Sequence, residues 1–141
     1  MKKIILVGTN EGSFDYNRHV DFASIKNVEL QLQLHAEMVF KEGLDTVMVV
    51  IFTRYLHGKE QLINYSVSLT FKVEHWSEYV RSMSEKDILG TEEVHRMLGV
   101  TVGFLRGSLS LQLRSTTLNG AFLPLVNIEE LCKDVNVNRL I

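Results

Sequence analysis

The sequence predicts an α+β fold, in which an antiparallel meander-type sheet is followed by a long helix and a short C-terminal helix. Polar and apolar residues alternate over long stretches between residues 28 and 75, which indicates half-buried strands. The apolar stretch EEVHRMLGVTVGFLRGSLSLQL, residues 92–113, has apolar residues at helical spacing. Asn127 then precedes Glu129 and Glu130, a pattern typical of a helix start.

The strands are predicted from residues 28–40, 46–56 and 61–75. The first and third alternate strictly, with turn residues at 41–45 and 57–60 between the strands. The middle of the second, residues 47–52, is apolar on both sides, which predicts a central strand covered on both faces. Three consecutive strands joined by short turns form a meander. A short helical or crossover segment at 76–86 follows.

The composition fits one compact domain over residues 1–141. The chain has 141 residues and is 45% hydrophobic and 23% charged, as expected for a globular protein. Residues 1–27 are its poorly defined N-terminal segment, with strand-like character at 3–7 and 20–25 and turn-like character at 8–13. The net charge of −2, without a basic block, argues against nucleic acid and anionic membrane as partners.

The chain is expected to be cytoplasmic. Cys132 is the single cysteine, so no intrachain disulfide can form, which suits a reducing compartment. The apolar run near the N-terminus is shorter than the core of a signal peptide. The longest apolar run, residues 47–52, is far shorter than a membrane span.

The predicted helix 92–113 can begin at Thr91 as N-cap, with Glu92 and Glu93 in its first turn. One apolar stripe is formed by Leu98, Val102, Leu105, Leu109 and Leu113. A competing interpretation exists, because Ser108 to Leu113 alternates as a strand would. On pattern alone, residues 103–115 fit a fourth strand as well as a helix.

Three glycines four residues apart, Gly99, Gly103 and Gly107, fall on one side of this helix, about 6 Å apart along its axis. Together they cost about 3 kcal/mol relative to alanine, which favours a close contact on that side. One interpretation is packing on the protein's own sheet. The other, which we favour, is an oligomer interface at Gly99, Gly103, Gly107 and Leu111, because the helix has more apolar surface than one sheet face covers.

A second set of apolar residues lies in or beside the loops and the last helix. Each fits a role in the core when taken alone. As a set they suggest an apolar groove that binds other chains. These candidate client-binding residues are Trp76, Tyr79, Phe122, Leu123, Val126 and Leu131.

Catalytic and metal-binding motifs are missing from the sequence. The five histidines are scattered without metal-ligand spacing. Cys132 has no nucleophile context, and no serine elbow, paired-carboxylate motif or dinucleotide fingerprint occurs. We therefore expect a protein without catalytic residues, metal or cofactor, which is not an enzyme.

The second half of the chain resembles SecB, the bacterial preprotein-export chaperone, and its relatives. The order of elements is similar over residues 28–131, and the specific likeness lies in 98–131. Gly103-Phe104-Leu105-Arg106-Gly107 is similar to the aromatic–small or apolar–Arg segment of that family's helix. Residues 120–131, GAFLPLVNIEEL, resemble its loop, Pro/Val/Asn element and last helix.

The resemblance implies a four-stranded antiparallel sheet with helices on one face, and a helical counterpart for residues 108–113. It implies a homotetramer, a dimer of dimers joined by the long helices. It implies an ATP-independent holdase that binds unfolded polypeptides, for protein export or for an antitoxin client. Asn64, Ser66 and Ser68 stand where export chaperones dock the translocase motor through acidic residues, so the sequence gives little support for that partner.

Two other functions remain open from the sequence. A small-molecule-binding or enzymatic antiparallel α+β domain would need a closed cavity of ligand size. A structural interaction module would have a single dedicated partner.

Overall fold

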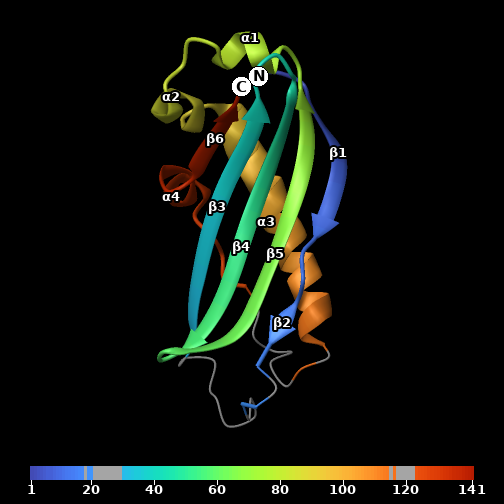
Figure 1. Ribbon diagram of the computed structural model, residues 1–141, viewed down its shortest axis with the longest axis vertical. Helices are drawn as coiled ribbons and strands as arrows, with labels where there is room; N and C mark the ends of the chain where they lie inside the picture. The colour runs from blue at the N-terminus through green and yellow to red at the C-terminus, as the bar shows by residue number, and fades with distance from the viewer. Residues whose placement is uncertain (18, 21–29, 115, 117–122) are drawn as a thin grey trace.

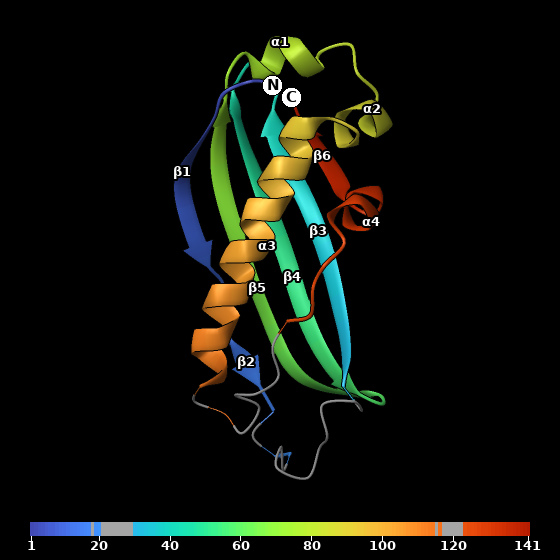
Figure 2. The same ribbon diagram turned by 180° about the vertical axis from the view of Figure 1, so that it is seen from behind.

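The computed structural model describes residues 1–17, 19–20, 30–114, 116 and 123–141 (Figure 1). It confirms the α+β class: a mostly antiparallel, six-stranded sheet carries a long helix on one face, and short helices pack against that helix (Figures 1 and 2). The strands are β1 Ile4–Glu11, β2 Asp15–Tyr16, β3 Gln31–Lys41, β4 Thr46–His57, β5 Glu60–Val73 and β6 Asn136–Leu140. The helices are α1 Trp76–Val80, α2 Glu85–Leu89, α3 Glu92–Leu113 and α4 Ile128–Lys133.

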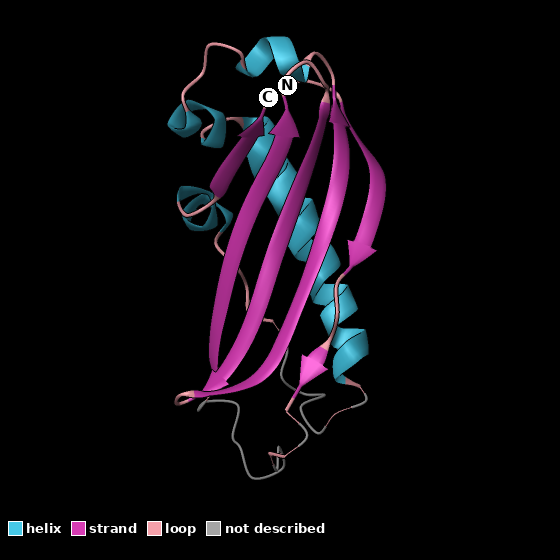
Figure 3. Ribbon diagram, viewed as in Figure 1, coloured by secondary structure: helices cyan, strands magenta, loops and turns pink. Residues whose placement is uncertain are grey.

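The strand order is β1-β5-β4-β3-β6, and β2 pairs with β5 off this path. Strands β3, β4 and β5 form the predicted meander, with antiparallel pairing throughout. Figure 3 shows the strands as one twisted layer with α3 behind it. The sheet has two strands more than the four that the family resemblance implies, because β2 and β6 add to its edges.

The hydrophobic core lies between the sheet and α3. Alternate residues of β3, β4 and β5 turn toward the helix and are buried, as period-two alternation requires. The helix contributes the predicted stripe, and all five of its members are buried: Leu98, Val102, Leu105, Leu109 and Leu113.

The other face of the sheet is not covered by any described element. β4 is central, as predicted, but the prediction that both of its faces are covered is wrong within this chain. Met48 and Val50 on that outer face are half-buried, and Phe52 is 41% exposed. Their own neighbours on β3 and β5 shield them in part, since outer-face side chains pack against each other across strands.

Helix α3 begins and ends as the sequence predicts. The side chain of Thr91 accepts a hydrogen bond from the backbone N–H of Val94, and Glu92 and Glu93 occupy the first turn. The alternative strand is wrong for residues 103–113, which belong to the helix, and residue 115 lies outside the described residues. Burial of the five-residue stripe between helix and sheet outweighs the local Leu-Ser alternation. No helix among the described residues combines the length and apolarity needed to cross a membrane.

The N-terminal segment contains more strand than expected. β1 continues through Glu11, so the predicted turn at 8–13 is wrong for residues 8–11. A register shift between Leu6 and Gly8 leaves Val7 without a partner residue in the ladder with β5. The second expected strand, residues 20–25, lies almost wholly outside the described residues.

The C-terminal residues form a strand that the sequence did not predict. The side chain of Asn127 caps α4, as predicted, by accepting a hydrogen bond from the backbone N–H of Glu130 at 3.3 Å. β6 then pairs in parallel with the Glu37–Lys41 half of β3. Only Val137 within β6 points into the core, so the strand carries almost no hydrophobic pattern of its own.

Candidate functional site: exposed apolar surfaces

The outward side of α3 is the first of three apolar surfaces that the described residues leave uncovered. A Cβ atom built on Gly99, Gly103 or Gly107 meets no neighbouring atom within 4 Å. Val100 is 44% exposed and Leu111 is 61% exposed. These five residues span an arc of about 120° of the helix, and we call them the open face of α3.

The glycines therefore do not pack on the protein's own sheet. That interpretation required atoms close to the glycine side of the helix, and the structure places open space there. The buried stripe lies on the opposite side of the helix. The oligomer interface at Gly99, Gly103, Gly107 and Leu111 stays a prediction.

The free edge of β1 is the second surface. β1 pairs on one side with β5 and has no strand among the described residues on its other side. Ile5, Leu6 and Val7 are 45%, 46% and 55% exposed. An apolar edge strand offers unpaired backbone groups together with side chains that can be buried, so it is suited to pairing with another chain.

The third surface is the segment that leads into α4. Residues 123–127, which we call the strap, lie on the helix side of the sheet (Figure 2). Leu123 is buried and Leu125 is 96% exposed, so neighbouring apolar side chains of the strap point in opposite directions. Leu125 was not among the predicted client-binding residues. The local sequence carries no signal for this difference, because residues two apart in an extended segment ordinarily lie on the same side.

The six predicted client-binding residues do not form a single exposed patch. Trp76, Leu123 and Leu131 are buried. Tyr79 and Val126 are half-buried, and Phe122 lies outside the described residues. Trp76 and Tyr79 contact each other on α1, with ring centroids 6.2 Å apart, whereas Leu123, Val126 and Leu131 belong to the strap and α4. Burial in the monomer suits a packing role for the three buried residues.

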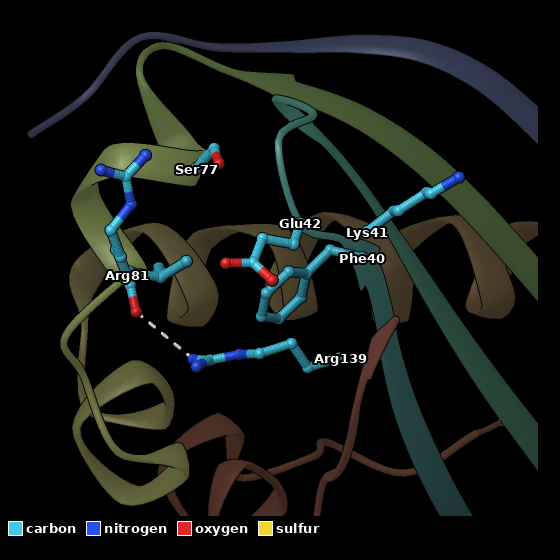
Figure 4. A pocket seen from close by; sticks show the side chains of 7 residues that line it. Phe40, Lys41, Glu42, Ser77, Arg81 and Arg139 are labelled. Atoms are coloured by element: carbon cyan, nitrogen blue, oxygen red, sulfur yellow. Dashed lines mark hydrogen bonds between the residues drawn. The ribbon is translucent and has the colours of Figure 1, made fainter. Parts of the chain in front are cut away.

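A small hollow lies between α1 and β6, where contacts of Arg139 connect the two elements (Figure 4). Arg139 of β6 donates hydrogen bonds of 3.3 Å to the carbonyl oxygens of Val80 and Met83. Its guanidinium also lies over the Phe40 ring, 5.5 Å from the centroid. The hollow holds about 20 Å³, roughly one water molecule. Arg139 thus ties the last strand to the segment after α1, and no ligand-sized space is left there.

The larger hollows are open depressions of 500 to 770 Å³ on the surface, not enclosed cavities. No group of three or more metal-ligating side chains occurs among the described residues. Cys132 lines one depression, but its side chain is buried, and that burial raises the pKa of its thiol to about 11. A thiol with so high a pKa is a poor nucleophile at neutral pH.

No protein-family model matches this sequence, and no curated protein matches it. A solved structure does match. The chain is similar to a SecB-like chaperone. That protein is from Mycobacterium tuberculosis, in complex with a ChAD peptide from the HigA1 antitoxin. The match covers 90% of this chain and 89% of that chain, at 14% sequence identity and a TM-score of 0.42. At this TM-score, no residue role is transferred from that structure.

Proposed function

We propose that this protein is an ATP-independent chaperone, a holdase that binds unfolded polypeptide and keeps it from aggregating. The observation that supports the proposal is the apolar surface that the monomer leaves uncovered, above all Leu125 on the strap. A leucine side chain that is 96% exposed gains nothing from the fold of its own chain. Buried against an unfolded client, it would contribute about 25 cal/mol for each Å² removed from water.

Apolar contact of this kind suits many clients. Burial is non-directional and requires no particular sequence, so unrelated unfolded segments would bind through the same surface. The proposed clients are export substrates or an antitoxin, and the proposed compartment is the cytoplasm. Docking of a translocase motor is not part of it.

A homo-oligomer, a tetramer in our proposal, accounts for the two other surfaces. The open face of α3 would contact the same face of a second copy, where Gly99, Gly103 and Gly107 allow the two helix backbones to approach closely. The exposed side chains of Val100 and Leu111 beside the glycines would then be buried.

The free edge of β1 would pair with β1 of another copy. An antiparallel, two-fold pairing centred on Val7 places Lys3 opposite Glu11 of the second copy, and Ile5 opposite Thr9. The pairing would therefore be favoured at both ends by opposite charges and would continue the sheet across two subunits.

The decisive experiment follows light scattering of an unfolding model protein, such as reduced insulin, without nucleotide. We expect suppression of scattering near an equimolar ratio of oligomer to insulin, unchanged when ATP is added. Absence of suppression at several-fold excess would overturn the proposal. Native mass provides a second readout, with a tetramer expected at four times 16.1 kDa.

The small-molecule binder and the dedicated interaction module are the alternatives. The hollows described above are open or hold about one water molecule, so they do not favour an enclosed ligand. A narrow set of co-purifying proteins, with no suppression of insulin aggregation, would favour the dedicated module.

A further inference from the structure

Arg106 joins the middle of α3 to the strap. Its guanidinium donates one hydrogen bond to the carbonyl oxygen of Leu123 and a second, of 3.2 Å, to the carbonyl oxygen of Pro124. Both acceptors are backbone atoms seventeen and eighteen residues further along the chain. Hydrogen bonds from a charged donor are roughly twice as strong as those between neutral groups, and the planar fork of arginine suits two neighbouring acceptors.

Few other contacts hold this part of the strap. Leu123 anchors one end through its buried side chain, and Asn127 anchors the other by capping α4. Between them, no backbone group of residues 124–126 has a hydrogen-bond partner among the described residues apart from Arg106. Leu123 and Val126 pack against the core on either side of Leu125, and Arg106 supplies the hydrogen bonds to the backbone beside it.

The same guanidinium also influences Tyr55, a buried residue of β4. Its positive charge lowers the pKa of Tyr55, although the burial of the phenol, which raises that pKa, is the larger effect. Arg106 is itself half-buried, so it is held between the core and the strap and does not extend freely into solvent. This position restricts its rotamers and fixes the two acceptors in place.

We propose that Arg106 is a positioning residue of the client surface, which holds the strap so that Leu125 is presented outward in one conformation to an extended, apolar client segment. The proposal rests on the proposed function and names the residues that carry it. Leu125 makes the contact, and Arg106 acts through the strap without touching the client.

A strap that is already ordered in the free protein favours client binding, because a mobile strap would have to become ordered in the binding step. Fixing the backbone costs conformational entropy, and this cost reduces the affinity when it falls in the binding step. With Arg106 in place, the cost is met during folding. Loss of Arg106 should weaken client binding about tenfold while leaving the buried core intact.

The test uses the full-length protein and two independent readouts. Fluorescence anisotropy measures the Kd for fluorescein-labelled, reduced and carboxymethylated α-lactalbumin. Amide hydrogen exchange measures the order of residues 123–127 without any client. The variants are Arg106→Ala, Arg106→Lys and Leu125→Asp. Matched controls are Arg96→Ala, an exposed arginine on the same helix, and Leu44→Asp, an exposed leucine in the turn between β3 and β4.

We expect Arg106→Ala to raise Kd about tenfold and to speed exchange in the strap, with Arg106→Lys intermediate, because lysine cannot bridge both acceptors as a planar fork. Leu125→Asp should raise Kd without changing exchange. Both controls should leave Kd unchanged. The inference is overturned if Arg106→Ala leaves exchange at 123–127 unaltered, or if exchange rises while Kd stays the same. Failure of the wild-type protein to bind the labelled client would instead count against the proposed function, and the exchange readout would still decide what holds the strap.

Discussion

The indole of Trp76 packs edge-on against the ring of Phe40, with centroids 5.5 Å apart and planes at 88°. This contact joins α1 to β3, and Trp76 is fully buried beside it. An aromatic pair in this geometry contributes about 0.5–1.5 kcal/mol beyond the area that it buries. Trp76 is therefore a core residue of the monomer, although the sequence made it a candidate for client binding.

Trp76 is also the chain's single tryptophan, so tryptophan fluorescence reports on this buried position. We expect emission at shorter wavelength in the folded than in the unfolded protein, and no shift or quenching when an unfolded client is added. Trp76→Ala should lower the free energy of unfolding by about 3–5 kcal/mol, because it removes a large buried side chain. A clear shift of emission on client binding would indicate that Trp76 contacts the client.

The strands of the meander could be predicted from sequence because their information is local. In β3 and β5, alternate residues are apolar, and register follows from which set is buried. The caps are local too, since Thr91 and Asn127 each bond to a backbone N–H three residues later. Period and caps together place most element boundaries within a few residues.

Two features, strand β6 and the exposure of Leu125, could not be predicted from the sequence because they depend on contacts between distant segments. β6 exists because Glu37–Lys41 offers a free edge to Asn136–Leu140. Nothing within β6 itself encodes a parallel partner about a hundred residues earlier. The predicted client-binding set lacks Leu125 for the same reason. Which of Leu123 and Leu125 turns inward depends on the core that receives Leu123 and on Arg106, which bonds to its carbonyl group.

Alanine is expected to have opposite effects at two glycines, one on the open face of α3 and one in a turn. Gly103→Ala should stabilise the monomeric fold by about 1 kcal/mol, because alanine has the higher helix propensity and its Cβ meets open space. Gly58→Ala is the contrasting control, since Gly58 has a φ of 61° that alanine rarely adopts. Urea unfolding of both variants checks the sign of each change.

Gly103→Leu tests the proposed helix contact between subunits. Leucine fits the open space of the monomer, so the helix should still form, but it would overfill a close approach of two helices. We expect a lower native mass in light scattering with unchanged helical circular dichroism. Retention of the wild-type mass would place Gly103 outside any interface.

Tyr55 predicts how stability depends on alkaline pH. Burial, offset in part by Arg106, raises the pKa of its phenol from 10.0 to about 12 in the folded protein. A pKa raised by folding gives a contribution to stability that is complete below pH 10 and is lost as pH rises from 10 toward 12. The urea midpoint of the wild-type protein should fall over this range.

Tyr55→Phe should reduce that fall. It should also cost little stability at neutral pH, because the buried hydroxyl of Tyr55 has no hydrogen-bond partner among the described residues. Burial raises the pKa of Cys132 in the same direction, so Cys132→Ser with Tyr55→Phe separates the two contributions. A midpoint of Tyr55→Phe that falls as steeply as that of the wild type would assign the alkaline transition to other groups.

Opposite charges at the two ends of β1 are expected to favour its pairing with β1 of a second copy. In the proposed two-fold pairing, Lys3 of one copy lies opposite Glu11 of the next, so Lys3→Glu would set two carboxylates against each other at both ends of the strand pair. We expect Lys3→Glu to shift the assembly toward smaller species in analytical ultracentrifugation, and added salt to reduce the difference from wild type. The double variant Lys3→Glu with Glu11→Lys restores opposite charges and should recover the larger species. Glu11 also accepts a hydrogen bond from the hydroxyl of Tyr65, so Glu11→Gln, which retains an acceptor, separates that bond from the charge effect. If the double variant stays as small as Lys3→Glu alone, β1 does not pair with itself in this register.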